Sequence, residues 1–139
     1  MKKSFFAFLL ITFSLSSFAQ QTKKDLIGKW EGTDKGNEKQ SLTFKDNGKV
    51  ILDLGGRVLN DLDYKIELTK TPAPLDIIIK TLDGKQQIPL KCFIQFMDNN
   101  TLKWQIFAGG DRPNPDNKSL SSTIALNDAI TIILKRKKT

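Results

Sequence analysis

Histidine is absent from this chain of 139 residues. Without an imidazole, the protein has no Ser-His-Asp or Cys-His catalytic group, no histidine-ligated zinc or haem, and no histidine pH switch. Its single cysteine, Cys92, cannot form an intrachain disulfide. The fold must therefore be stabilised by its hydrophobic core.

Long apolar runs are also missing. None reaches the roughly 18 residues that a membrane-spanning helix needs. The longest run, residues 5–15, follows two lysines and precedes small residues ending at Ala19, a pattern typical of an export leader. We expect residues 1–19 to be a signal peptide cleaved after Ala19, which lowers the formal charge from +7 to +5 with the loss of Lys2 and Lys3. The mature domain, residues 20–139, should be soluble in the periplasm or outside the cell, without stable membrane insertion.

Apolar and polar residues alternate in short runs from Trp30 onward, separated by Gly, Asn, Asp and Pro. This period of two predicts an all-β domain of about eight strands, either an up-and-down barrel or a sandwich. Residues 61–68 give the clearest run, and a helical turn is expected within residues 22–28. In the run after Gly84, Ile88 and Cys92 share the inward parity, and Pro89 should occupy an edge, a bulge or a strand start. Residues 108–119 are expected to form the longest loop, followed by strands at 122–126 and 129–137.

The segment Gly28-Lys29-Trp30 resembles the opening of the lipocalins, in which a helical turn precedes a Gly-x-Trp. In that family the Trp closes one end of the barrel and an Arg of the last strand packs across its ring; Arg136 matches that Arg in position and parity. From Leu26 to about Lys137 the chain is similar to small exported bacterial lipocalin-like domains of unknown function. This resemblance implies an antiparallel lipocalin-like β-barrel with Trp30 and Arg136 as its closing pair, and no known reaction. The other shared landmarks are Leu42-Thr43-Phe44, Tyr64-Lys65-Ile66, Pro74-Leu75-Asp76-Ile77, Asn100-Thr101-Leu102-Lys103-Trp104, Asp111-Arg112-Pro113 and the terminal Leu134-Lys135-Arg136.

Four residues are candidates for ligand binding. Phe44, Tyr64 and Trp104 have inward parity, where they either line a cavity or pack the core. Arg112 either meets a carboxylate or phosphate group at the barrel mouth, or anchors its loop by bonding backbone carbonyls or Asp111.

The sequence gives little support for catalysis, metal binding or nucleic-acid binding. The acidic residues lie on an outward strand face or in turns, so we expect no acid–base pair, metal site or cofactor. Cys92 is interpreted as a buried apolar residue, and export argues against a nucleic-acid partner. Several apolar residues with outward parity should form a covering cluster or the face of a homodimer; they are Ile51, Ile78, Phe93, Met97, Phe107 and Ile133.

Two functional hypotheses follow. The first is a non-enzymatic barrel that binds a small hydrophobic or amphipathic molecule in its interior. The second is a closed-core barrel that acts through protein contact, as an inhibitor or an envelope accessory module. An enzyme ranks third, because Cys92 or the carboxylates would have to act without histidine or metal. The volume and lining of the interior distinguish the first two hypotheses.

Overall fold

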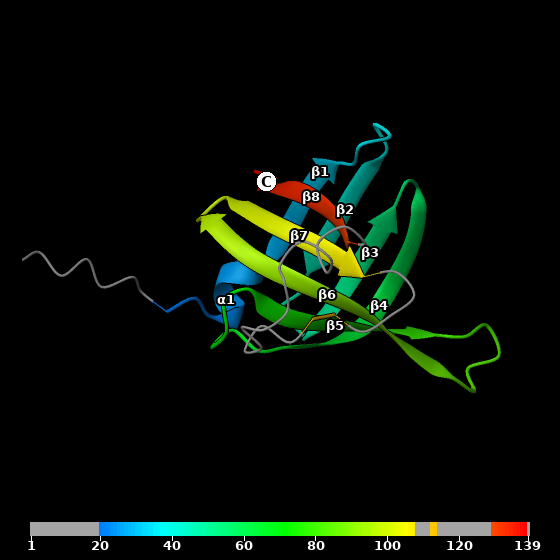
Figure 1. Cartoon of the computed structure of the whole chain (residues 1–139). Helices are drawn as coiled ribbons and strands as arrows, with labels where there is room; N and C mark the ends of the chain where they lie inside the picture. Colours follow the sequence, from blue (N-terminus) through cyan, green and yellow to red (C-terminus); the bar gives the residue numbers. More distant parts are fainter. Residues whose placement is uncertain (1–19, 108–111, 114–128, 139) are drawn as a thin grey trace, which may run out of the picture.

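Eight antiparallel strands close into an up-and-down barrel in this computed structural model, which describes residues 20–107, 112–113 and 129–138 (Figure 1). Each strand pairs with the next along the chain, and β8 pairs with β1 to complete the ring. The predicted all-β fold and strand order are confirmed. No helix within the described part is long and apolar enough to cross a membrane. The elements are α1 (Lys23–Leu26), β1 (Gly28–Thr33), β2 (Lys39–Phe44), β3 (Lys49–Leu54), β4 (Arg57–Ile66), β5 (Ala73–Lys80), β6 (Gln87–Asp98), β7 (Thr101–Phe107) and β8 (Ala129–Arg136).

The short helix α1 covers one end of the barrel, called the closed end below. The Asp25 carboxylate accepts a hydrogen bond from the backbone N–H of Thr22 at 2.7 Å and so fixes the single helical turn. Leu26 has no exposed surface, and its carbonyl accepts a hydrogen bond from the Trp30 indole at 2.7 Å. A buried side chain and a buried hydrogen bond therefore attach α1 to the core.

The barrel interior is an apolar core to which every strand contributes alternate residues. The inward positions expected for Leu42, Phe44 and Cys92 are confirmed, since all three are buried. The predicted loop at residues 108–119 falls largely outside the described residues, and the predicted strand at 122–126 falls entirely outside them.

Strand β4 corrects a sequence prediction, because it begins at Arg57 and not near residue 61. In its ladder with β3, residues 59–62 of β4 lie opposite residues 50–52, so β4 carries one additional residue. Asp61 lies in this bulge and adopts a φ of +51°. The bulge breaks the period of two, and the first part of β4 therefore showed no strand pattern in the sequence.

Strands β5 and β6 continue past the barrel wall as a two-stranded ribbon (Figure 1). β6 pairs with β5 from Gln87 onward, but with β7 only from Lys91 onward. Ile88 is 53% exposed on this ribbon, so its predicted place in the core is wrong. Pro89 lies on the same ribbon, in the part of β6 that has no β7 residue opposite it among the described pairs. The edge position predicted for Pro89 is confirmed, because no ladder hydrogen bond to β7 needs its missing N–H there.

The outward apolar residues have different environments. Phe93 and Phe107 are buried on the outer face and pack edge-to-face, with ring centroids 5.5 Å apart. Met97 and Ile133 are exposed. The Phe93–Phe107 pair is therefore a small apolar cluster outside the barrel core.

Candidate functional site

Trp30 and Arg136 meet at the closed end, where β1 and β8 complete the barrel. They are opposite each other in the β1–β8 ladder, and the Arg136 guanidinium lies 4.1 Å from the centre of the Trp30 ring. The guanidinium also donates hydrogen bonds to the carbonyls of Asp25 at 2.6 Å and Ile27 at 2.8 Å. A cation–π contact and a fork of hydrogen bonds thus hold the first helix against the last strand.

Gly28 explains the first residue of the Gly-x-Trp motif. Its φ of +123° lies in a region that side-chain-bearing residues rarely adopt, and a Cβ there would stand 3.4 Å from Nη1 of Arg136. The backbone turns at Gly28 from α1 into β1 and brings Trp30 beneath Arg136. This motif therefore builds the closed end of the barrel.

The centre of the barrel is filled by side chains. Phe44 is 1% exposed and Trp104 has no exposed surface. A side chain beside an internal void large enough for water would expose surface to that void, and these two do not. Phe44 and Trp104, two of the candidate ligand-binding residues, therefore lie in the packed core. The Trp104 indole nitrogen has no nitrogen or oxygen acceptor among the described residues; it interacts with the Cys92 thiol.

Tyr64 lies between the packed core and the surface. Its ring packs edge-to-face on Phe44 with centroids 5.2 Å apart, and Lys23 of α1 stands 6.0 Å from the ring centre. Partial burial raises the pKa of the Tyr64 hydroxyl above its usual value. The structure thus places Tyr64 against the closed end.

Arg112 lies on the outer face and not at the barrel mouth. Its guanidinium forms an ion pair with Asp76 of β5, bonds the Leu75 carbonyl at 3.3 Å, and stands 5.8 Å from the Phe93 ring centre. Of the two sequence interpretations, these contacts are those of an anchor, with Asp76 as an acidic partner; Asp111, the partner named from the sequence, lies outside the described residues.

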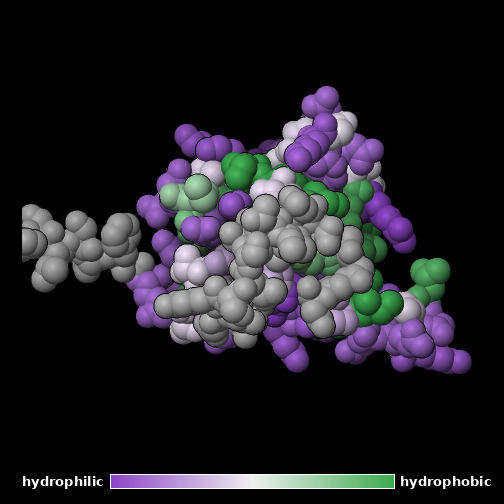
Figure 2. All heavy atoms as spheres, in the orientation of Figure 1, coloured by the Kyte–Doolittle hydropathy of each residue, from purple (hydrophilic) through white to green (hydrophobic). Residues whose placement is uncertain are grey.

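At the end of the barrel away from α1, called the open end below, inward-facing apolar side chains remain partly exposed among the residues that the structure describes. Ile130 of β8 is 49% exposed there, although Ile132 and Leu134 on the same face are buried. Figure 2 shows hydrophobic surface close to hydrophilic surface on the side that carries the β5–β6 ribbon. Other inward apolar residues towards this end are only partly buried against the core: Leu54, Leu59, Leu62, Ile79 and Leu90.

A slot between β4 and β5 leads into this open end. The two strands pair only where residues 63–66 face residues 75–78, so the first part of β4 has no β5 residue opposite it. A cavity of about 280 Å³ lies in the gap. Its apolar lining comes from Leu59, Leu62 and Ile79 on the inner face and from Val58 and Ile78 on the outer face.

Comparisons with protein-family models, with curated proteins and with solved structures found no match. Function is therefore inferred from the residues around the slot and from their charges. Within the described residues, no three acidic or cysteine side chains gather in a way that could hold a metal ion.

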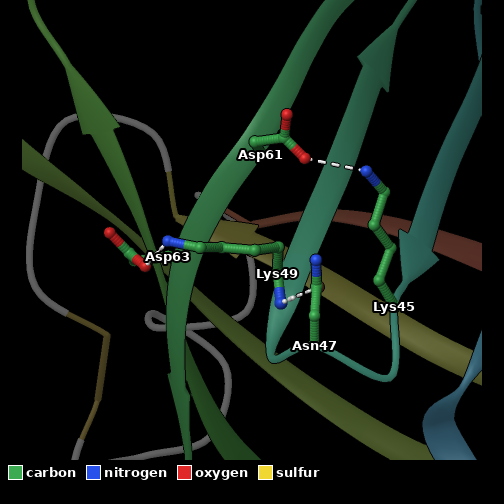
Figure 3. A network of polar contacts seen from close by, with 5 residues as sticks. All are labelled: Lys45, Asn47, Lys49, Asp61 and Asp63. Atoms are coloured by element: carbon green, nitrogen blue, oxygen red, sulfur yellow. Dashed lines mark hydrogen bonds and ion pairs between the residues drawn. The ribbon is translucent and has the colours of Figure 1, made fainter.

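Two ion pairs fix the polar rim of the slot (Figure 3). Lys45, in the β2–β3 turn, bonds Asp61 at 2.7 Å, and Lys49 bonds Asp63. Each lysine lowers the pKa of its carboxyl partner, mainly through the hydrogen bond, and Lys80 lowers that of Asp63 further through its charge. Lys45 and Lys49 neutralise the two carboxylates from outside the slot, and Lys80 is the cation that its described lining provides.

Sequence reasoning missed the slot because it missed the first half of β4. A signal was present in Gly55 and Gly56, a pair typical of a two-residue hairpin turn, followed after Arg57 by Val58 and Leu59. Both glycines have positive φ, +62° and +92°. Reading them as a turn would have placed a strand start at residue 57 and Leu59 near the barrel opening.

Proposed function

We propose that this chain is an exported, non-enzymatic lipocalin-like protein that binds a small hydrophobic or amphipathic molecule at the open end of its barrel. The observation that carries the proposal is the set of inward apolar side chains there that are only partly buried among the described residues, beside the slot of about 280 Å³. A pocket of this size is close to the lower end of the range for small ligands, about 300 Å³. The filled centre limits how far a ligand can enter.

The two sides of the slot suggest how a ligand lies. An apolar tail inserted between Leu59, Leu62 and Ile79 would remove their exposed surface from water, which is favourable. Lys80 stands at the same slot and would face a carboxylate or phosphate at the other end of the ligand. The proposed ligand class is therefore an anionic amphiphile with a single short tail.

Fluorescence titration with a fatty-acid probe tests this proposal. The wild-type protein should bind the probe, and Ile79→Thr should weaken binding about tenfold, because an ethyl group of the apolar lining is replaced by a hydroxyl without a partner. Ile133→Thr is the matched control, since Ile133 is a strand isoleucine on the outer face of β8. Absence of probe binding, or equal losses in the two variants, would contradict the proposal.

Export is part of the same proposal and has its own test. The lysines, apolar run and small residues that end at Ala19 support cleavage before Gln20. N-terminal sequencing of protein recovered from the periplasm or the medium should begin at Gln20. A sequence that begins at Met1 would contradict export by this leader.

Protein contact through the β5–β6 ribbon is the second candidate. Leu82 at the ribbon tip is fully exposed and Ile88 is half exposed, so the ribbon presents apolar surface away from the barrel. If the ribbon joins two copies, Leu82→Asp should convert a dimer to a monomer in sedimentation analysis. A monomeric wild-type protein would rule out the homodimer.

A further inference from the structure

Gln20 lies at the closed end of the barrel, in the non-helical segment before α1. Together with Gln21, the β4–β5 loop and the last part of β6, it lines a cavity of about 650 Å³. Cleavage after Ala19, which is part of the proposed function and on which this inference rests, makes Gln20 the first residue of the mature chain. We infer that Gln20 then cyclises to pyroglutamate, so that the mature protein begins with an uncharged lactam at this cavity.

The reaction uses groups that an N-terminal Gln20 carries itself. The free α-amino nitrogen attacks Cδ of the side-chain amide, so that a bond between this nitrogen and Cδ forms and the bond between Cδ and Nε2 breaks. One proton of the amine passes to the departing nitrogen, which leaves as ammonia. The attack is intramolecular and closes a five-membered ring, which gives the nucleophile a high effective concentration. No oxidant, metal or second substrate is needed.

The surroundings of Gln20 leave this ring closure open. Gln20 is exposed, and within the described part of the chain its side-chain amide has no hydrogen-bond partner. The hydrogen bonds of this segment begin at Thr22, whose backbone N–H and hydroxyl both donate to the Asp25 carboxylate. The chain is therefore fixed two residues after Gln20, and cyclisation breaks none of the described hydrogen bonds.

The lactam suits the apolar part of the cavity better than a free N-terminus does. An α-ammonium group is strongly hydrated, and it loses part of that hydration wherever it approaches apolar surface. The lactam ring has no charge and carries two CH₂ groups beside its single N–H and C=O. Cyclisation thus lets the first residue lie against the apolar lining, which consists of Leu68, Ala73, Ile94 and Phe96.

An uncharged N-terminus also protects the closed end from trimming. Aminopeptidases recognise a free α-amino group, which pyroglutamate lacks. Trimming beyond Gln21 would remove Thr22, the residue that holds the Asp25 carboxylate at the start of α1. The carbonyls of α1 in turn accept hydrogen bonds from Trp30 and Arg136, so the first residues of the mature chain support the closing pair.

The two adjacent glutamines provide a matched test. Both line the cavity, but the small residue required before the cleavage site is Ala19, so Gln20 is the one that becomes N-terminal. Tandem mass spectrometry of the protein recovered from the periplasm or the medium should find the wild-type chain one ammonia lighter than calculated from Gln20, with the loss at its first residue. Gln20→Ser should abolish the loss, and Gln21→Ser should retain it. An aminopeptidase should shorten Gln20→Ser and leave the other two proteins intact.

The outcomes separate this inference from the proposed function. A chain that begins at Gln20 with a free α-amino group, both when isolated and after storage at neutral pH, would overturn the inference and leave export standing. A chain that begins at Met1 would overturn both. Equal shortening of the wild-type protein and Gln20→Ser by the aminopeptidase would also overturn the inference. Binding of the fatty-acid probe should be the same in all three proteins, because Gln20 and Gln21 lie apart from the residues that line the slot.

Discussion

At the scale of single residues, Cys92 shows how burial determines the chemistry of a side chain. The Cys92 thiol has no exposed surface, and burial raises its pKa to about 12. The indole of Trp104 and the charge of Arg112 favour the thiolate, but their effect is smaller than that of burial. Because the thiolate is the reactive form, this cysteine should be inert while the protein is folded.

We expect a thiol reagent at pH 8 to label Cys92 only as fast as the protein unfolds. The raised pKa also implies that the contribution of the thiol to stability is complete below the ordinary pKa of 9.0 and is lost as the pH rises toward about 12. Between pH 7 and pH 10, wild-type stability should thus fall more steeply than that of Cys92→Ala in urea unfolding. Fast labelling of the folded protein would show that the thiol is accessible.

The period of two located the inward residues correctly where strands are regular. Trp30, Phe44 and Trp104 were assigned to the interior because a strand presents alternate residues to one face. The same pattern could not show whether a void lies beside them, since that depends on how side chains from eight strands fill one volume. Two proposed ligand contacts therefore proved to be packed core residues.

At the scale of the elements, strand β4 limits what could be predicted. Its bulge at Asp61 changes which residues face inward, so that Leu59 and Leu62 share a face although they are three positions apart. A pattern search that assumes strict alternation ends at such a point. The prediction for Ile88 failed for a different reason. Its parity was correct, but this part of β6 belongs to the ribbon outside the barrel.

Replacing Asp61 tests whether the bulge is held by its backbone conformation. Asp61→Val should destabilise the protein, because a β-branched residue is strained at a φ of +51° and the ion pair with Lys45 is lost. Asp63→Val is the control, since it also loses a lysine partner but lies in regular strand. The urea midpoint should be lower for Asp61→Val than for Asp63→Val. Equal midpoints would mean that the ion pairs, and not the conformation, matter here.

At the scale of the whole molecule, the barrel depends on a narrow seam between β1 and β8. The ladder there joins Trp30 to Arg136 and Glu31 to Lys135, and the next residue, Gly32, approaches β8 closely. A Cβ on Gly32 would stand 2.4 Å from the carbonyl oxygen of Ile133. The two strands can meet because Gly32 has no side chain.

Gly32→Ala should therefore destabilise the protein by about 1–3 kcal/mol, the usual effect of overpacking. Hydrogen exchange should accelerate first in β1 and β8, while β5, β6 and β7 remain protected. Gly36→Ala is a suitable comparison, because the nearest atom to a Cβ there is a side-chain oxygen of Asp34, at 3.3 Å, and not a backbone atom of a neighbouring strand. Uniform acceleration across all strands would argue against a local seam.

Which end of the barrel is open could not be read from the sequence. The answer depends on where neighbouring strands stop pairing, as β4 and β5 do before residue 63. It depends also on α1, whose attachment through Leu26 requires the folded barrel. The strand order was predictable because short turns join antiparallel neighbours.

The contact between Arg136 and the Asp25 carbonyl places the last strand next to the first helix at the closed end. A short linker could therefore join these two regions, and the chain could be cut instead at Gly84 in the exposed β5–β6 turn. Every strand pair of the barrel would persist in such a circular permutant. We therefore expect the ring of strands to form whichever strand the chain begins with, and circular dichroism of the permutant would check this.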